Sequence, residues 1–456
     1  MSIMNLNWTR SQPGWRTPHA TPGARAACEY QRQAIEEWWL NDFQGILAMA
    51  TGTGKTVTAL SAIRDLSASE RVPLVVLVLA PFKHLVDQWC AEIARWGGRF
   101  IACYESTDTW VSAASEGIAL TRAGIRDSVF LVATHATSNL PAFRNLIMSA
   151  PGESLCVIAD EAHRLGAPSL WNALPPNARF RLGLSATPER DEDETGTERL
   201  LEYFGGVVFE FGIDEAIAAG ALAPYEYFPE LVPLDRDELN EYRNIVERLE
   251  RELAREPDGR SAKLIGQLYL QRATVLNTAR GKLKALREAV ERQRPDRSLI
   301  YCAGRPQLAA VMDLLWAQGI TSRQFTGEES RRERTALLEG LVSGATPALV
   351  AIRCLDEGVD IPEAMSGYLL ASSGNPREFV QRRGRLLRLS VGKTRARIFD
   401  YIVVPDGRAD HEREVMRREV RRVMTFAQAA LNGSRAIEAL WPTIERFDLV
   451  HELGVP

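Results

Sequence analysis

The sequence predicts an α/β protein with two parallel-sheet lobes in tandem, a helical insertion between them and a C-terminal helical segment. Short, strongly apolar runs alternate with helical patterns between residues 45 and 210 and again between residues 298 and 402. Runs this apolar are typical of strands that are buried on both faces of a parallel sheet. A polar block at residues 235–296 has helical character instead. A chain of 456 residues is also long enough for two or three domains.

The strands that we expect form two groups of five. The first lobe would contain Gly45–Met49, Leu74–Leu79, Val129–Ala133, Leu155–Ala159 and Leu182–Leu184. The second lobe would contain Ser298–Cys302, Ser322–Phe325, Ala348–Ile352, Gly367–Ala371 and Arg397–Ile402. The polar block is interrupted at residues 256–259 by Glu-Pro-Asp-Gly, which indicates a helical hairpin. After about Arg408, apolar residues at helical spacing, beginning with Met416 and Val420, predict a helix that faces the core.

These patterns divide the chain into five segments. They are an N-terminal arm rich in proline and glycine (1–27), the first lobe (28–230), the helical insertion or linker (231–297), the second lobe (298–405) and the C-terminal helical segment (406–456).

The composition excludes several classes of site and indicates a cytoplasmic protein. A net charge of −4 does not mark a nucleic-acid binder, so such a site would have to be a local patch. The six cysteines form no Cys-x-x-Cys pair and the six histidines no metal-spaced pair, which argues against a zinc site and a disulfide framework. The N-terminus lacks a secretory signal pattern, and no apolar run approaches the length of a membrane helix.

Residues 50–56 read Ala-Thr-Gly-Thr-Gly-Lys-Thr, between a predicted strand and a helical pattern. A strand, a glycine-rich turn and a helix form the context of a phosphate-binding loop, because the glycines let backbone N–H groups crowd around phosphate oxygens. Lys55 would reach the β- and γ-phosphates, and the Thr56 hydroxyl would bind Mg²⁺. Met49 occupies the place of the usual first glycine, so a chance turn remains the alternative for this stretch taken alone.

Acidic and hydroxyl side chains follow the next buried strands. Asp160 and Glu161 come directly after the fourth predicted strand, where a phosphate-loop enzyme needs its second Mg²⁺ contact. Asp160 would hold the ion, usually through water, and Glu161 would orient or deprotonate the attacking water. A solvated acidic turn is the alternative. After the fifth strand, the hydroxyls of Ser185 and Thr187 could bond to His163 and link the nucleotide site to the lobe interface.

Residues 381–388 read Gln-Arg-Arg-Gly-Arg-Leu-Leu-Arg. On a helix, Gln381, Arg385 and Arg388 would lie on one face. That face could present two guanidinium groups to a γ-phosphate held by the first lobe, since arginine supplies fixed charge and bidentate donors to the developing negative charge. A solvated basic helix is the alternative, but it would not explain the regular spacing around Gly384.

These motifs occur in the order found in superfamily-2 helicases, together with Tyr30-Gln31, Ala80-Pro81…Leu85…Gln88 and Asp356-Glu357-Gly358-Val359-Asp360-Ile361-Pro362. The chain most resembles the branch that contains type III restriction subunits and related DNA-repair helicases. The resemblance spans about residues 28–405, and this superfamily often lacks the glycine that Met49 replaces. It implies two RecA-like lobes with ATP in the cleft between them. The helical tail also resembles that of stand-alone helicases that accompany restriction and phage-defence systems, including those linked to phosphorothioate-modified DNA.

The resemblance implies a role for each residue that matches a motif. The ATP-binding set would be Tyr30, Gln31, Thr51, Gly52, Thr53, Gly54, Lys55, Thr56, Gly358 and Asp360, with Thr56 and Asp160 on Mg²⁺. The catalytic set would be Lys55, Glu161, Gln381, Arg385 and Arg388, with the last two as arginine fingers, and the coupling set His163, Ser185 and Thr187. Weaker nucleic-acid candidates are Pro81, Lys83, Gln88, Thr134, Arg305 and Thr326. Lys83 and Arg305 could equally be solvated surface charges.

Two further groups of basic residues have no single interpretation. Arg417, Arg418, Arg421 and Arg422 could flank a DNA track or form a solvated helix face. Arg272, Arg280, Lys282 and Lys284 in the polar block could guide a strand or bind a partner.

The function that the resemblance implies is that of an ATP hydrolase, an ATP-dependent DNA helicase or translocase that uses ATP and Mg²⁺ and moves 3′→5′ along single- or double-stranded DNA. Its setting would be restriction, phage defence or DNA repair. No added nuclease is apparent, so cleavage would need a nuclease or defence-system partner subunit. An RNA helicase is one alternative, with RNA the less favoured substrate. The other is a nucleotide-controlled scaffold without motor activity, against which intact Lys55, Glu161 and the two arginines argue.

Overall fold

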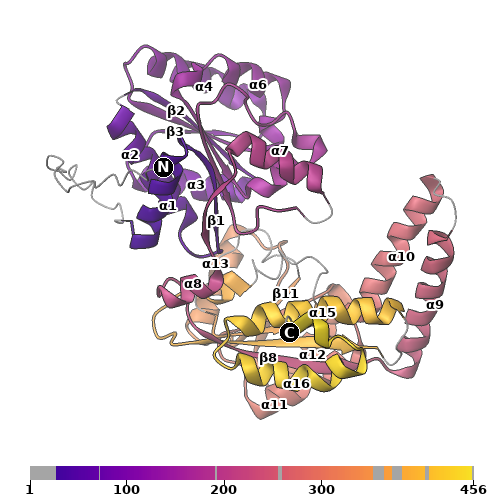
Figure 1. Ribbon diagram of the computed structural model, residues 1–456. Helices are drawn as coiled ribbons and strands as arrows, with labels where there is room; N and C mark the ends of the chain where they lie inside the picture. Colours follow the sequence, from indigo (N-terminus) through magenta and orange to yellow (C-terminus); the bar gives the residue numbers. More distant parts are fainter. Residues whose placement is uncertain are drawn as a thin grey trace, which may run out of the picture.

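The structure is a computed structural model that describes residues 27–70, 72–190, 193–254, 259–352, 364–371, 383–405 and 410–453. Two parallel sheets form two lobes, which lie one above the other in Figure 1. This confirms the predicted α/β class with two parallel-sheet lobes in tandem. The expected N-terminal arm lies, except for its last residue, outside the described residues.

The first lobe is built on a seven-stranded parallel sheet with the strand order β3-β4-β2-β5-β6-β1-β7. Its strands are β1 (Gln44–Met49), β2 (Leu74–Ala80), β3 (Phe100–Cys103), β4 (Ser128–Thr134), β5 (Leu155–Asp160), β6 (Phe180–Ser185) and β7 (Val207–Phe211). The five expected strands are all present. The two strands that the sequence did not reveal, β3 and β7, are the edges of the sheet, and each has partly exposed residues rather than a continuous apolar run.

Helices cover both faces of this sheet, and the burial pattern follows from the strand geometry. They are α1 (Glu29–Leu40), α2 (Lys55–Glu70), α3 (Lys83–Arg95), α4 (Thr107–Arg122), α5 (His135–Ser138), α6 (Pro141–Met148), α7 (Glu194–Phe204) and α8 (Ile213–Ala218), with short turns at Gly152–Ser154, Ala162–Gly166 and Pro168–Leu170. Successive side chains of a strand point to opposite faces. In β2, Val76 and Val78 accordingly belong to the hydrophobic cluster that contains Trp38, whereas Val75 and Leu77 belong to the cluster that contains Trp110.

The second lobe is built on a six-stranded sheet with the order β10-β11-β9-β12-β13-β8. Its strands are β8 (Tyr225–Pro233), β9 (Ser298–Cys302), β10 (Ser322–Phe325), β11 (Ala348–Ile352), β12 (Ser366–Leu369) and β13 (Ala396–Val404). The helices are α9 (Arg236–Leu253), α10 (Gly259–Asn277), α11 (Arg280–Arg292), α12 (Arg305–Ala317), α13 (Arg331–Val342), α15 (Asp410–Gln428) and α16 (Gly433–Arg446), with a last turn at Val450–Leu453. The five expected strands are again present, and β8 is additional.

The lobe boundary differs from the expected one at residue 230, which falls inside β8. This strand pairs with β13 along its whole length and therefore belongs to the second sheet. Its sequence contains two glutamates, Glu226 and Glu230, and two prolines, Pro229 and Pro233, so it gave no buried-strand signal. Helix α11 also packs on this sheet, through Leu286 and Val290.

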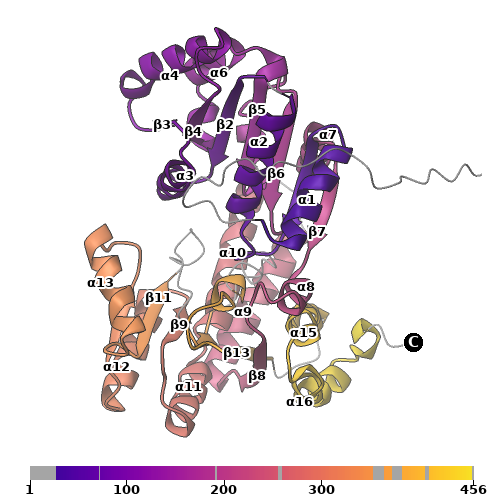
Figure 2. The same ribbon diagram turned by 90° about the vertical axis from the view of Figure 1, so that its left-hand side faces the viewer.

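The C-terminal helices α15 and α16 are likewise attached to the second lobe, beside β8 (Figure 2). The ring of Phe426 in α15 stacks on Tyr227 of β8, with 4.9 Å between the centroids. The expected segment 406–456 is therefore not a separate unit in space. The helices α9 and α10 project from the lobe as the expected hairpin (Figure 1).

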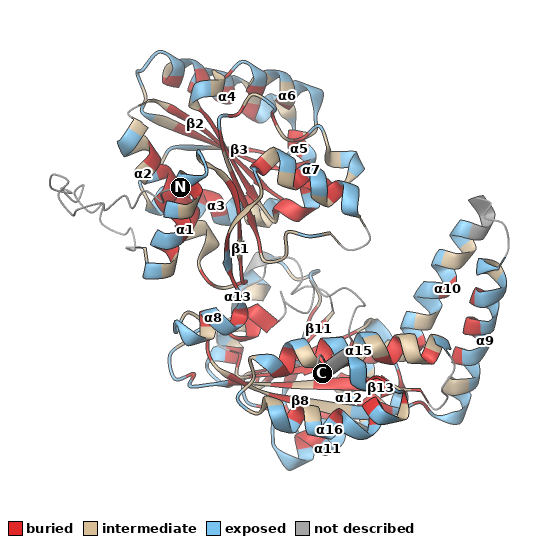
Figure 3. Cartoon of the chain, in the orientation of Figure 1, coloured by how far each residue is buried: buried red, intermediate tan, exposed pale blue. Residues whose placement is uncertain are grey.

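Burial is concentrated in the two sheets and on the helix faces turned toward them, as Figure 3 shows. In the hairpin, the buried residues, such as Tyr242, Ile245 and Leu268, lie where α9 and α10 pack together. Within the described ranges, no helix combines the length and the apolar composition that crossing a membrane requires.

Candidate active site

Residues 50–54 make a tight turn between β1 and α2. Gly52 and Gly54 have φ angles of +93° and +83°, in the region that favours glycine because a Cβ would be strained there. Helix α2 begins at Lys55, directly after the turn, so the free N–H groups of its first turn lie at the loop. The Lys55 Nζ donates to the carbonyl of Met49 at 3.1 Å, which folds the lysine back across the loop. This geometry is that of an anion-binding site.

Two side chains of α1 form hydrogen bonds to the backbone of this loop. The Tyr30 hydroxyl donates to the carbonyl of Thr53 at 2.9 Å, and its ring stacks on Phe211 with 4.3 Å between centroids. The buried Gln31 donates through Nε2 to the carbonyls of Thr53 and Gly54 at 3.3 and 3.4 Å. Both residues therefore contact the phosphate-binding loop, and an adenine contact of Gln31 stays a prediction.

Two carboxylates stand at the end of β5, close enough to Lys55 to favour its charged form. Asp160 accepts a hydrogen bond from the Trp89 indole at 3.0 Å and another from the backbone N–H of Glu161 at 3.0 Å. Burial, and then the neighbouring Glu161, raise the pKa of Asp160 to about 6. Burial also lowers the pKa of Lys55. Asp160 and Lys55 are both half-buried, so a bound cation or phosphate would interact with them more strongly than in bulk water.

The predicted coupling residues lie together behind Glu161. Its backbone has a φ of +48°, which is uncommon for a residue other than glycine and costs conformational free energy. Its Oε2 lies 3.6 Å from Nδ1 of His163, which is 3.0 Å from the Ser185 hydroxyl. That hydroxyl accepts the backbone N–H of Thr187 at 3.2 Å. Ser185 thus contacts His163, whereas Thr187 joins this chain of contacts through its backbone N–H, and its hydroxyl does not bond to His163. A role of these residues in coupling stays a prediction.

The second lobe brings a short arginine segment, residues 383–388, against the phosphate-binding loop. A Cβ on Gly384 would lie only 2.7 Å from the carbonyl oxygen of Thr51. Similarly, a Cβ on Gly52 would lie 2.9 Å from Cγ of Arg388. The two lobes are therefore in contact at these glycines.

This contact brings the two predicted arginine fingers to the first lobe. Both Arg385 and Arg388 act electrostatically on Lys55, where they disfavour its positive charge. Burial lowers the pKa of Arg388. The site therefore contains three basic groups from two lobes beside two carboxylates, a surplus of positive charge that suits a polyanion.

Three predicted site residues, Gly358, Asp360 and Gln381, lie outside the described residues. The sequence reasoning in turn missed Trp89, whose indole holds one oxygen of Asp160. Trp89 directly follows Gln88, the last residue of the motif that begins at Ala80-Pro81. This position does not specify a hydrogen bond to Asp160.

The weaker nucleic-acid candidates differ in what they contact. Lys83 is exposed, with its Nζ 5.8 Å from the centroid of Tyr104. Pro81 precedes α3, and the exposed Gln88 belongs to the same helix as Lys83. Thr134 is buried, and its hydroxyl caps α5 by accepting the backbone N–H of Thr137 at 3.0 Å. In the second lobe, Arg305 pairs with Glu328, and the Thr326 hydroxyl donates to Glu329 at 2.9 Å. A nucleic-acid contact of these residues stays a prediction.

Two basic residues suggested as surface guides are buried, so that interpretation is wrong for them. Arg422, 7% exposed, pairs with the fully buried Asp400 at 3.1 Å. Lys282, 3% exposed, donates to the carbonyl of Leu370 at 2.6 Å. The sequence could not show this, because helical spacing alone does not indicate which face of α11 or α15 packs against the second sheet.

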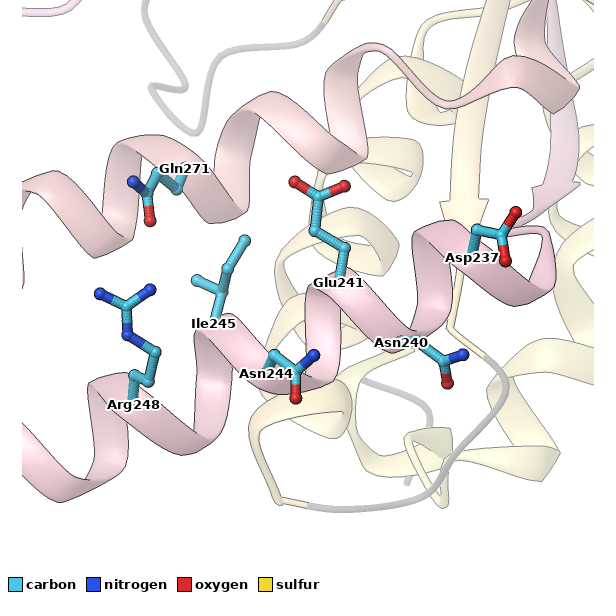
Figure 4. A pocket seen from close by; sticks show the side chains of 7 residues that line it. All are labelled: Asp237, Asn240, Glu241, Asn244, Ile245, Arg248 and Gln271. Atoms are coloured by element: carbon cyan, nitrogen blue, oxygen red, sulfur yellow. The ribbon is translucent and has the colours of Figure 1, made fainter.

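A separate surface pocket lies along the helical hairpin (Figure 4). It is lined by Asp237, Asn240, Glu241, Asn244, Ile245, Arg248 and Gln271. None of these belongs to the phosphate-binding loop, the acidic turn or the arginine segment, so this pocket is not part of the candidate active site.

Comparison with known proteins gives two family matches and a consistent group of relatives. Residues 26–190 match the res subunit of type III restriction enzymes, and residues 281–390 match the helicase conserved C-terminal domain. The chain is 24% identical over 418 residues to the DNA 3'-5' translocase XPB2 of Sulfurisphaera tokodaii, covering 86% of this chain and 84% of that protein. It is 25% identical over 398 residues to the putative DNA 3'-5' helicase Rad25 of Haloarcula marismortui, and 23% over 361 residues to the DNA 3'-5' helicase XPB of Mycobacterium tuberculosis. The chain spans 54% and 57% of the length of these last two proteins.

Solved structures show the same fold. The ATP-dependent Type ISP restriction-modification enzyme LlaBIII bound to DNA aligns with a TM-score of 0.61 at 18% identity, over 88% of this chain and 30% of that chain. The Pyrococcus furiosus Hef helicase domain aligns with a TM-score of 0.53 at 16% identity, over 82% of this chain and 94% of that chain. The two lobes are thus RecA-like, as predicted. With its two family matches, the chain belongs to the superfamily-2 helicases, in the branch of the type III restriction res subunit, and its predicted class of ATP-hydrolysing helicase or translocase is confirmed.

Proposed function

We propose that this chain binds ATP and Mg²⁺ where its two lobes meet, and couples hydrolysis to 3′→5′ movement along DNA. The observation that carries the proposal is the packing of Gly384 on Thr51, which brings Arg385 and Arg388 to the phosphate-binding loop. This is the arrangement that a two-lobe motor needs, because closure of the lobes then completes the hydrolytic site.

The residues present fit a magnesium nucleotide. Two glycines with positive φ and the start of α2 form an anion cradle beside Lys55. The Thr51 hydroxyl is buried, and among the described residues it has no hydrogen-bond partner, so it is available to a ligand. Thr56 and Asp160 would hold Mg²⁺, which when bound neutralises charge on the phosphate oxygens.

The chain's own residues have distinct tasks in this proposal. Lys55 would bind the β- and γ-phosphates. Glu161 would take a proton from the attacking water on a carboxylate oxygen, and its strained backbone holds that carboxylate near His163. Arg385 and Arg388 would stabilise the charge that develops during phosphoryl transfer.

Movement along DNA would follow from alternate opening and closing of the two lobes. The first lobe, residues 28 to about 224, and the second lobe, which begins at β8, would each grip backbone phosphates at the strand ends, through Lys83 and Arg305 among others. Thr134 would act there through the helix cap it forms rather than through a direct contact. DNA as substrate and the 3′→5′ direction are supported by the names of the relatives, XPB2 and XPB.

The setting that we favour is restriction, phage defence or DNA repair. The res-subunit match supports the first two, and cleavage would then need a partner nuclease. DNA nicking by the purified chain with ATP and Mg²⁺ would overturn the need for such a partner.

The proposal is tested by comparing the wild type with Glu161→Gln in ATP hydrolysis stimulated by single-stranded DNA, duplex DNA and RNA. The exposed Glu153 provides a matched control, Glu153→Gln, which removes the same charge elsewhere in the first lobe. We expect Glu161→Gln alone to lose turnover, by about 10²–10⁴-fold as for a general base. Stimulation by RNA alone would favour an RNA helicase, and equally poor hydrolysis by wild type and Glu161→Gln would favour the scaffold alternative. Strand displacement from 3′-tailed, 5′-tailed and blunt duplexes tests the direction.

A further inference from the structure

We propose that the C-terminal helix α15 is a working part of the ATPase, because it holds the arginine segment in position through Arg383. The inference rests on the proposed function, in which Arg385 and Arg388 act on bound nucleotide. In this view Arg383 is a positioning residue and does not itself contact the nucleotide.

The side chain of Arg383 is directed to α15 and β8. It is 6% exposed, and its Nη1 donates to the carbonyl of Thr425 at 2.8 Å and to the Tyr225 hydroxyl at 3.3 Å. Its guanidinium carbon lies 4.7 Å from the centroid of the Phe426 ring, a cation–π contact. Three contacts with α15 and β8 thus fix a guanidinium that directly precedes Gly384.

The opposite side of the same segment touches the first lobe. Gly384, the next residue, packs on the backbone of Thr51, and Arg388 packs on Gly52. The segment is therefore held between α15 and the phosphate-binding loop, so that a shift of the helix would move the arginines relative to the nucleotide.

The chain between the lobes fastens the far end of the segment. The backbone N–H of Ala223 donates to the carbonyl of Leu387 at 2.7 Å, and Leu222 forms a single β-bridge with Arg388. β8 begins two residues after Ala223, at Tyr225. The connection between the lobes therefore leads directly into the strand whose Tyr225 binds Arg383. The linker, the arginine segment and α15 thus form one connected unit.

Helix α15 is itself locked to the second sheet. Its Arg422 pairs with Asp400 of β13, and the other oxygen of Asp400 accepts the Tyr227 hydroxyl at 2.8 Å. A buried charge pair tolerates little displacement, because separating the charges leaves each of them unpaired away from water. The position of α15 on the sheet is therefore fixed, and the contacts of Arg383 fix the arginine segment relative to α15.

The test uses the full chain with Arg383→Met, Arg383→Lys and, as a matched control, Arg435→Met, which removes an exposed arginine from α16. DNA-stimulated hydrolysis gives kcat and KM for ATP, and thermal unfolding and DNA binding are measured alongside. We expect Arg383→Met to lower kcat by about 10- to 100-fold, the scale of a misplacement of about 1 Å, with KM and DNA binding nearly unchanged. Tm should fall modestly, because two hydrogen bonds of this buried side chain are lost, but the protein should stay folded at the assay temperature. Lysine keeps one donor to Thr425 and should restore part of kcat, while Arg435→Met should behave as the wild type.

Wild-type kcat in Arg383→Met would overturn the inference, and so would a loss of kcat that only follows a loss of Tm and DNA binding. If Arg383→Met does not fold, Phe426→Leu tests the same link between α15 and the arginine segment. It removes the cation–π contact with Arg383 and keeps an apolar side chain. A fall in kcat at constant KM supports the inference, and an unchanged kcat overturns it. Absence of hydrolysis in the wild type would instead reject the proposed function, and this inference with it.

Discussion

Replacing Gly384 by alanine should separate catalysis from stability in this protein. Gly384 does not have a positive φ, so an alanine causes no strain in its own backbone. It lies in a short helical turn, residues 383–386, where alanine is favoured over glycine by about 1 kcal/mol. The free energy of unfolding should therefore be unchanged or slightly increased.

The cost of Gly384→Ala lies in the contact between the lobes. The added Cβ would lie 2.7 Å from the carbonyl oxygen and 2.8 Å from the Cβ of Thr51, where ordinary contacts begin at 3.4 Å. The arginine segment must therefore retreat from the phosphate-binding loop by about 0.7 Å, the difference between 3.4 and 2.7 Å. Because the obstructing atom is backbone, it cannot rotate away. A shift of this size should lower kcat by about 10- to 100-fold.

The assay is steady-state ATP hydrolysis at saturating DNA, with thermal unfolding of the same preparations. Gly266→Ala is the matched control, since Gly266 lies within α10 and a Cβ there would meet no atom within 4 Å. We expect Gly384→Ala to lose turnover and keep its Tm, and Gly266→Ala to keep both. A Gly384→Ala enzyme with wild-type turnover would refute the reasoning that this lobe contact aligns the arginines.

Three further predictions concern buried groups. Arg422→Met leaves the carboxylate of Asp400 buried without its cation, so urea unfolding should show a loss of about 3–5 kcal/mol, and a loss under 1 kcal/mol would contradict the buried pair. Burial lowers the pKa of Lys282 from 10.5 to about 8, so the unfolded chain binds more protons between these values and stability should rise with pH in that window. Relative to Lys282→Met, the wild type should gain about 2 kcal/mol between pH 7.5 and 9.5, and parallel pH profiles would disprove it. Finally, Cys28 is exposed, whereas burial raises the pKa of Cys302 to about 12, so a thiol reagent at pH 8 should label Cys28 and spare Cys302 until the protein unfolds, as mass spectrometry of the labelled peptides can show.

The central strands and the phosphate-binding loop could be predicted because their physical requirements are local. Strand β2 is buried on both faces and must be apolar throughout, which is visible in the sequence. The loop at residues 50–54 needs glycines for its positive φ angles, and a helix must follow it. Edge strands need not be apolar throughout, because they are only partly buried. β8 is an edge strand that contains two glutamates and two prolines, so its membership of the second sheet could not be predicted.

By itself, the sequence determined the two-lobe α/β class, the glycine-rich loop that we propose binds phosphate, and the acids and arginines around it, because each of these leaves a pattern within a few consecutive residues. Only the tertiary structure decided that Trp89 holds Asp160, that Arg422 is a buried partner of Asp400, and that Arg383 ties the arginine segment to α15. Those roles depend on which faces of the helices the sheets cover. A solvated arginine and a buried one occupy the same helical spacing, and the difference arises only when distant parts of the chain pack together.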